Sequence, residues 1–159
     1  MTRMQATLAA LAVITMPILL GGCADDGHAL ASTLEAAVVE TVPHATGAIV
    51  ELNYDGSPLR RGVGVKVYID SERQDDLAAA VDGALHTLWS KFPVEPVRVS
   101  VAVVSGPEPL NADYVAMDGE RLDDAIDALG LDPGDLDLKA IIVHSEELEQ
   151  RYGPWKKPE

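Results

Sequence analysis

Side chains that could do chemistry are scattered along this chain. None of its four histidines, His28, His44, His86 and His144, has a second ligand-type residue at the spacing of a zinc site. Ser105 has no identifiable general base, and neither a GxSxG nor an SxxK nucleophile motif occurs. The sequence therefore predicts no catalytic, cofactor-binding or metal-binding residue.

Carboxylates gather between residues 118 and 137, and calcium is the first ligand to consider there. The acidic residues of this segment are Asp118, Glu120, Asp123, Asp124, Asp127, Asp132, Asp135 and Asp137. An EF-hand loop needs oxygen ligands at its first, third and fifth positions and a glycine at the sixth. Counted from Asp132, the last three of these positions hold Gly134, Leu136 and Asp137, so the motif is absent. We expect the carboxylates to cover an exposed helix face and to favour solubility.

The end of the chain, "RYGPWKKPE", combines aromatic and cationic side chains. Tyr152 and Trp155 stand close to Lys156 and Lys157. Aromatic residues next to cations are typical of contact surfaces, because they combine a large apolar area with a polar group. Tyr152 and Trp155 are therefore candidate partner contacts. A frayed tail is the alternative interpretation.

The only cysteine, Cys23, lies in "PILLGGCADD", where an apolar run meets two aspartates. The 15 residues from Ala6 to Leu20 are apolar except for two threonines and Pro17, and Arg3 is the only charge before them. A membrane-spanning helix needs about 20 apolar residues, whereas the core of an export signal needs about 7 to 15. Pro17 also interrupts a helical hydrogen bond. The start of the chain therefore predicts an export signal.

The residues Leu20, Gly21, Gly22 and Cys23 resemble the lipobox of bacterial lipoprotein precursors. The resemblance covers residues 1–23 and rests on the positive start, the apolar core, the small residues and the cysteine in that order. It implies a diacylglyceryl group on the Cys23 sulfur, cleavage between Gly22 and Cys23, and fatty acylation of the new amino terminus. Two alternatives stay open: an ordinary thiol behind an uncleaved anchor, and a simple secretory signal cut nearby.

Lipidation would consume a thiol that could not form a disulfide within the chain, because no other cysteine exists. Each buried methylene contributes about 0.8 kcal/mol to membrane binding, and stable anchoring needs two acyl chains or more. The lipobox resemblance thus implies a protein held on the outer side of the cytoplasmic membrane by covalent lipid, in the cell envelope.

The charge balance is acidic, with a formal net charge of −14. Cleavage before Cys23 removes Arg3 and leaves 11 basic and 26 acidic residues, a net charge of −15. Nucleic acid is excluded as a partner, because phosphate binding relies on basic patches. Anionic lipid headgroups should also repel such a chain, which makes a covalent anchor more necessary.

Domain organisation follows from the signal and the periodicity. We expect a signal peptide at 1–22, a lipidated amino terminus and tether at 23–45, an α/β domain at 46–152 and a C-terminal tail at 153–159. Inside the tether, Leu34, Val38 and Val42 are four residues apart and allow one helix over Ser32 to Val42.

Alternating apolar residues predict strands at 48–54, 62–70, 97–104 and 138–144, with a weaker one around 113–117, and the first two as a hairpin. A capping box at Ser71 and Gln74 predicts a helix that ends at Pro93. Further helices are expected at 120–129, with Asp118 as cap and Gly130 as stop, and at 146–152, with Ser145 as cap. From Gly62 the order is strand, helix, strand, strand, helix, strand. This order predicts an α+β two-layer sandwich, ferredoxin-like (split βαβ), with an extra N-terminal strand.

The function predicted from these features is a non-enzymatic, lipid-anchored envelope protein that presents an acidic α/β domain for binding or assembly with an unidentified envelope protein or ligand. One alternative is an envelope enzyme whose active site no motif encodes. Another is a free secreted protein with a cation-dependent fold. A fold of this kind identifies no activity by itself.

Overall fold

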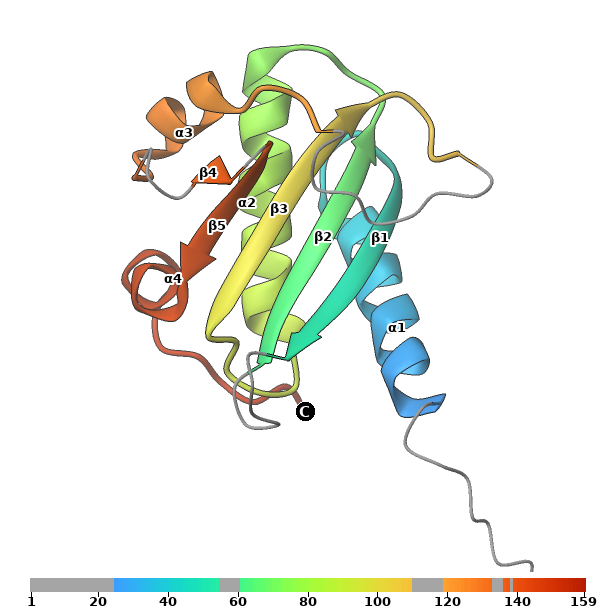
Figure 1. Cartoon of the computed structure of the whole chain (residues 1–159), viewed down its shortest axis with the longest axis vertical. Coiled ribbons are helices and arrows are strands. Elements are labelled where there is room, and N and C mark those ends of the chain that lie inside the picture. Colours follow the sequence, from blue (N-terminus) through green and yellow to red (C-terminus); the bar gives the residue numbers. More distant parts are fainter. Residues whose placement is uncertain (1–24, 55–60, 110–118, 133–135, 138) are drawn as a thin grey trace, which may run out of the picture.

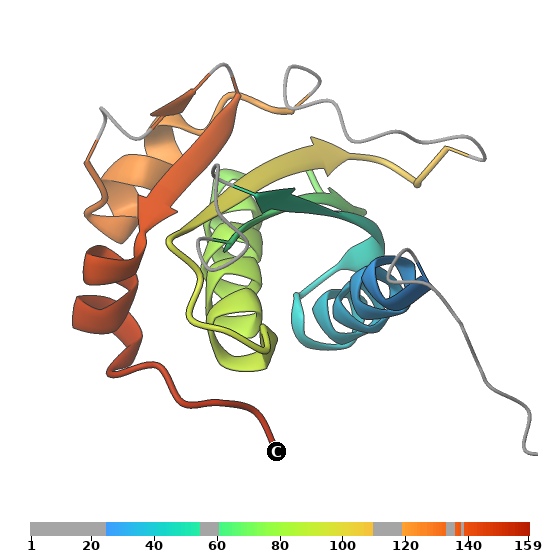
Figure 2. The same cartoon turned by 60° about the horizontal axis from the view of Figure 1, so that its bottom comes forward.

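The computed structural model describes residues 25–54, 61–109, 119–132, 136–137 and 139–159. The elements in chain order are α1 (Asp25–Thr41), β1 (Ala45–Tyr54), β2 (Arg61–Ile69), α2 (Gln74–Lys91), β3 (Arg98–Ser105), α3 (Asp123–Leu129), β4 (Leu136–Asp137), β5 (Ala140–His144) and α4 (Ser145–Tyr152). The strands form one mixed sheet in the order β1-β2-β3-β5-β4 (Figure 1). Helices α1 and α2 lie side by side on one face of this sheet, so the fold is α+β, with a sheet layer and a helix layer (Figure 2).

The centre of the sheet is a hairpin followed by a crossover. Strands β1 and β2 pair antiparallel, with Val50 opposite Val65, which confirms the predicted hairpin. Helix α2 then carries the chain back so that β3 runs parallel to β2, with Val65 opposite Val101. Strand β5 closes against β3 in the antiparallel direction, with Val99 opposite Val143. The valines that alternate along β2 and β3 face the helices and form the core.

The predicted ferredoxin-like order is not confirmed. A split βαβ arrangement requires another strand between the two parallel strands, whereas β2 and β3 are direct neighbours along eight paired residues from Gly62↔Arg98 to Ile69↔Ser105. The extra N-terminal strand also has a simple place: β1 pairs with the open side of β2 and forms one edge of the sheet. The strand expected around 113–117 lies outside the described residues.

The segment expected as a tether forms a packed helix. Helix α1 begins at Asp25, seven residues before the helix predicted there, and runs to Thr41. Leu34, Val38 and Val42 are at most 4% exposed and pack against the core, which accounts for their four-residue spacing. The described part of the expected tether therefore belongs to the folded body of the protein.

Helix α2 buries the stripe that its spacing predicts. Leu77, Val81, Leu85, Leu88 and Phe92 are each at most 2% exposed and lie in the core. The helix ends at Lys91, and the next residue adopts an extended conformation before a proline, as predicted.

The capping box predicted for α2 is wrong. The cap residue is Arg73, without a side-chain cap bond, and the helix begins at Gln74 itself. Ser71 lies two residues before the cap, where its Oγ accepts a hydrogen bond from the Arg73 N–H (3.3 Å) and donates one to Asp76 Oδ2. Ser71 thus shapes the turn that leads into the helix.

In the last third of the chain, helix α3 is shorter than predicted and the cap residues differ from the predicted ones. Helix α3 begins at Asp123 rather than Glu120, and the expected cap Asp118 lies outside the described residues. Gly130 stops the helix in the left-handed conformation (φ 64°), as predicted. Helix α4 begins at Ser145, with His144 rather than Ser145 as its cap residue.

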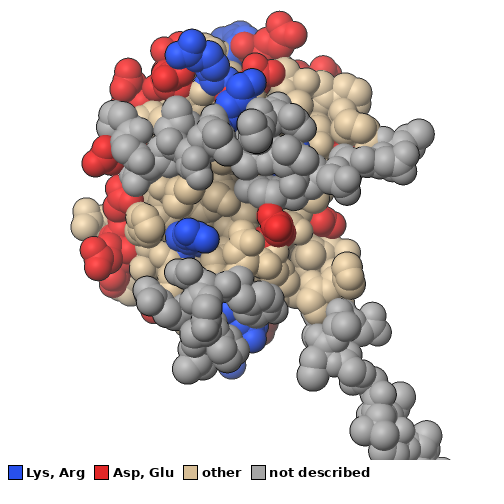
Figure 3. Space-filling model, viewed as in Figure 1, with Lys and Arg blue, Asp and Glu red and all other residues tan. Residues whose placement is uncertain are grey.

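Side chains are also buried on the sheet face that points away from α1 and α2. In β2, Lys66 (2% exposed) and Tyr68 (4%) point to this face and are nevertheless buried. The same face is viewed in Figure 3, where described acidic side chains gather along the periphery and few charges occupy the middle. Strand β2 is therefore buried on both of its faces.

Candidate functional site

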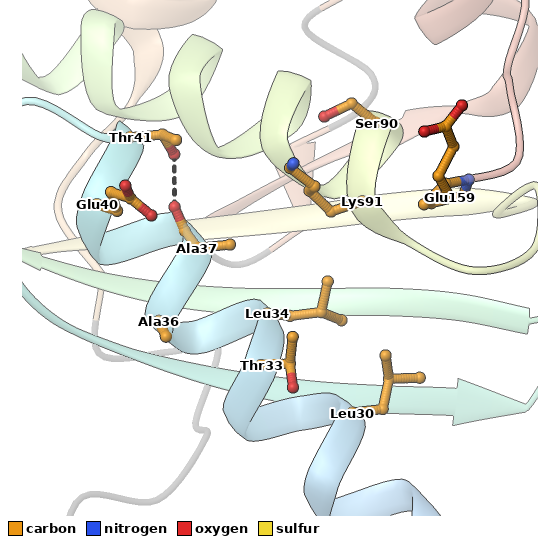
Figure 4. A pocket seen from close by; sticks show the side chains of 11 residues that line it. Leu30, Thr33, Leu34, Ala36, Ala37, Glu40, Thr41, Ser90, Lys91 and Glu159 are labelled. Atoms are coloured by element: carbon orange, nitrogen blue, oxygen red, sulfur yellow. Dashed lines mark hydrogen bonds between the residues drawn. The ribbon is translucent and has the colours of Figure 1, made fainter.

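A groove with a volume of about 760 Å³ runs between α1, the end of α2 and the last residues of the chain. Its lining is Leu30, Thr33, Leu34, Ala36, Ala37, Glu40 and Thr41 from α1, Ser90 and Lys91 from α2, and Pro158 and Glu159 from the tail. Figure 4 shows the α1 side chains on one side, with Ser90 and Lys91 on the facing end of α2. The groove is thus built from both ends of the described chain.

Helical spacing gives the groove its apolar floor. Leu30, Leu34 and Ala37 recur at steps of four and three along α1 and so lie on one side of the helix. Leu34 is 1% exposed and also belongs to the core, while Leu30 packs against it from the rim. The charged residues of the lining are Glu40, Lys91 and Glu159.

The hydroxyl groups of the groove are already used within the fold. Thr33 Oγ1 donates to the Ala29 carbonyl (2.8 Å), and Thr41 Oγ1 lies 2.7 Å from both the Ala37 carbonyl and Thr87 Oγ1. A hydroxyl bonded to its own helix carbonyl is not poised as a nucleophile, because no base withdraws its proton. Among the described lining residues, the groove therefore offers contact surface rather than acid–base chemistry.

The predicted partner contacts, Tyr152 and Trp155, are engaged inside the molecule. Tyr152 Oη donates to Asp82 Oδ1 (2.8 Å), and its ring lies against His86 with the centroids 5.1 Å apart. Trp155 is partly buried against the core, and its Nε1 is buried without a hydrogen-bond partner in the described part of the chain. The frayed tail of the alternative interpretation is not observed either.

The end of α4 and the first residue of the tail are fastened to α2 by hydrogen bonds. Trp89 Nε1 donates to the Gly153 carbonyl (3.1 Å). Arg151 Nε donates to Asp82 Oδ1 (2.8 Å), and Arg151 Nη1 reaches the Leu129 carbonyl (2.8 Å). Asp82 accepts from both Arg151 and Tyr152, and Trp89 binds the Gly153 carbonyl. We call Asp82, Trp89, Arg151, Tyr152 and Gly153 the tail latch.

Burial and the neighbouring carboxylate of Asp82 raise the pKa of Tyr152, the phenol of the tail latch. Burial is the larger cause and, together with the hydrogen bond to Asp82, raises the pKa of Tyr152 above its ordinary value of 10. Both effects oppose the phenolate, because it would be poorly solvated and would face a negative charge.

The remaining sequence-predicted residues are not brought together. Cys23 and Gly22 lie outside the described residues. His44 approaches Asp76 at 3.9 Å, and the Ser105 hydroxyl donates to the Ser71 carbonyl (3.0 Å). In the described part of the chain, no three metal-ligating side chains form a cluster.

Sequence reasoning missed the groove. Its α1 side carries a signal, because Leu30 extends the four-residue spacing of Leu34 and Val38 by one turn. Its other side carries none, because nothing in Pro158 or Glu159 indicates that the tail crosses the end of α2 to reach α1.

Comparisons of the chain with protein-family models, with curated proteins and with solved structures each found no significant match. No helix among the described residues combines the length and the apolar content needed to cross a bilayer.

Proposed function

We propose that the chain is the precursor of a lipid-anchored cell-envelope protein, which presents an acidic α+β domain on the outer side of the cytoplasmic membrane for binding or assembly with another envelope component. In this proposal the signal peptidase cuts between Gly22 and Cys23, and acyl groups on Cys23 hold the mature protein on the bilayer. Residues 1–22 serve export alone.

The observation that carries the proposal is the position of the LGGC motif relative to the folded body. The motif ends at Cys23, and α1 begins at Asp25, so only Ala24 separates the acylated residue from the first helix. The described core residues run from Leu34 to Leu148. Cleavage before Cys23 would therefore remove none of the described core, as a removable export signal requires.

The proposal is tested by following export and processing of the full chain in a bacterial host that processes lipoproteins. We expect the wild-type protein to lose residues 1–22 and to partition into detergent with the membranes. The Cys23→Ser variant should keep residues 1–22, because the acceptor of the diacylglyceryl group is missing. Ala24→Ser is the matched control, since it places a hydroxyl beside an intact thiol and should be processed normally.

Normal cleavage of Cys23→Ser, or wild-type protein released in soluble form without detergent, would contradict the proposal. Either result would favour a simple secretory signal.

A further inference from the structure

Resting on the lipid anchor proposed above, we propose that one end of the domain sits against an anionic phospholipid surface through Lys91, Lys156 and Lys157. This end, which we call the anchor end, comprises the start of α1, the end of α2, the starts of β2 and β3, and residues 153–159. The opposite end, the far end, comprises residues 70–76 at the start of α2 together with residues 121–129, which include α3.

The fold places the anchor end next to the acylated residue. Helix α1 begins at Asp25, and Figure 1 shows its start at the same end of the molecule as the C-terminus and the end of α2. Figure 2 shows the C-terminal segment approaching the same end of α2. With one residue between Cys23 and α1, this end cannot move far from the bilayer, because each extended residue spans about 3.5 Å.

The cations at the two ends differ in whether they form ion pairs. At the far end, Arg73 pairs with Asp75 and Asp76 (both 3.8 Å), and Arg121 pairs with Asp123 (3.1 Å). At the anchor end, Lys91, Lys156 and Lys157 are exposed and form no ion pair with any residue that the structure describes.

The tail latch fastens the chain at Gly153, and Trp155 packs against the core just before Lys156 and Lys157. Lys156 lines a small hollow with Trp89 and Ser90 of α2, and the last two residues reach the groove beside Lys91. Lys156 therefore lies beside the end of α2 that carries Lys91, and Lys157 is its neighbour in the chain. Strands β2 and β3 add Arg61 and Arg98 as their first residues at the same end.

Because carboxylates also lie at the anchor end, the effect of its lysines is limited to orienting the tethered domain on the membrane. Glu95 and Glu159 belong to this end, α1 begins with Asp25 and Asp26 in the sequence, and Glu146 and Glu147 open α4 beside the start of β3, so carboxylates at least balance the cations there. The far end is clearly negative, with Asp70, Glu72, Asp75, Asp76, Asp123 and Asp124. An acidic protein tethered to an anionic surface lowers its free energy by turning its strongly negative end away and its less negative end, with the unpaired lysines, inward. Each lysine within about 8 Å of the surface favours that orientation about fivefold.

The test uses the mature, lipidated protein in vesicles of phosphatidylcholine, with or without phosphatidylglycerol. Acylation blocks Cys23, so Ser90→Cys and Gln74→Cys each introduce a single free thiol for a fluorophore. Both positions are exposed, and they lie near opposite ends of α2, about 24 Å apart along the helix axis. Quenching by brominated lipid reports which end lies closer to the bilayer.

We expect stronger quenching at position 90 than at position 74, and a larger difference when phosphatidylglycerol is present. The triple variant Lys91→Gln, Lys156→Gln, Lys157→Gln should lose the phosphatidylglycerol-dependent part. The matched control Arg73→Gln, Arg121→Gln, Lys139→Gln removes the same net charge away from the anchor end and should keep it. High salt should abolish the difference that phosphatidylglycerol makes.

Equal quenching at the two positions, no dependence on phosphatidylglycerol, or equal effects of the two triple variants would overturn the proposal. Co-flotation with pure phosphatidylcholine vesicles reports the acyl anchor separately, because neutral lipid gives the lysines no attraction. Wild-type protein that fails to float with those vesicles would refute the anchor, and the orientation with it.

Discussion

The two ends of α2 carry opposite charges that are used in different ways. Its first turn holds Asp75 and Asp76, and its last turn holds Lys91, so both ends complement the helix dipole. Dipole stabilisation therefore explains the sign of each charge without any external partner. Only the first turn has its charges paired, through Arg73, whereas Lys91 has no ion pair in the described part of the chain.

The two ends of α2 therefore differ more clearly in whether their charged side chains form ion pairs than in the sign of those charges. The dipole accounts for Lys91 but not for Lys156 and Lys157, which follow α4 and belong to no helix. The anchor end gathers these cations only because the tail latch returns the tail to α2. Substitutions at the anchor end should therefore lower the free energy of unfolding more than substitutions at the far end.

The largest effect on stability should come from Phe92→Ala. Phe92 is 1% exposed at the end of α2 and fills the core there. Its loss should lower the free energy of unfolding by about 3–5 kcal/mol, because a cavity remains. Urea titration of the protein measures this change. Phe92→Leu keeps most of the volume and should cost clearly less; equal costs would contradict the packing argument.

Asp82→Ala should release the tail latch. It removes the acceptor of both Arg151 and Tyr152, and we expect a loss of about 1–3 kcal/mol in the free energy of unfolding. Trypsin should also cut faster after Lys156, which limited proteolysis followed by mass spectrometry detects; Lys157 precedes Pro158 and is not a trypsin site. Asp127→Ala on the exposed face of α3 serves as the control. Unchanged cleavage in Asp82→Ala would show that the latch does not hold the tail.

Alkaline pH should weaken the same cluster. Because burial and Asp82 raise the pKa of Tyr152 in the folded state, its contribution to stability is complete below the unfolded pKa of about 10 and is lost as the pH rises above it. The urea midpoint should therefore fall above about pH 10. The Tyr152→Phe variant should be less stable at neutral pH, and its urea midpoint should fall less steeply at alkaline pH. If the midpoint of the variant falls as steeply as that of the wild type, groups other than Tyr152 cause the fall.

The smallest effect is expected at the far end. Arg121 and Asp123 are 84% and 54% exposed in their side chains, and water screens pairs of this kind. Their pairing lowers the pKa of Asp123, through the hydrogen bond from Arg121 first and its charge second. Arg121→Gln should leave the urea midpoint unchanged at neutral pH. A clear drop would show that the far end depends on its surface pairs.

Much of the fold could be predicted because its signals are local. The valine alternation of β2 and β3 and the apolar stripe from Leu77 to Phe92 fix two strands and a helix, and Gly130 fixes a helix end. The order of strands could not be predicted, because periodicity shows which face of a strand is buried but not which neighbour it pairs with. The ferredoxin-like order failed at that point.

The candidate groove and the anchor end depend on contacts that are distant in sequence. Trp89 and Gly153 are 64 residues apart, and Asp82 and Tyr152 are 70 apart. Contacts between residues so far apart depend on the tertiary arrangement of the elements, and neither the residue types nor their spacing indicates the pairing. The prediction of Tyr152 and Trp155 as partner contacts identified residues suited to an interface, and the structure uses them within the chain.

Lipidation of Cys23 can be read from the intact mass of the protein extracted in detergent from a lipoprotein-processing host. We expect a chain that begins at Cys23 and carries the added mass of a diacylglyceryl group, with or without an amide-linked acyl chain. A mature chain that begins at another residue, or one that begins at Cys23 with a free thiol and no added mass, would contradict it.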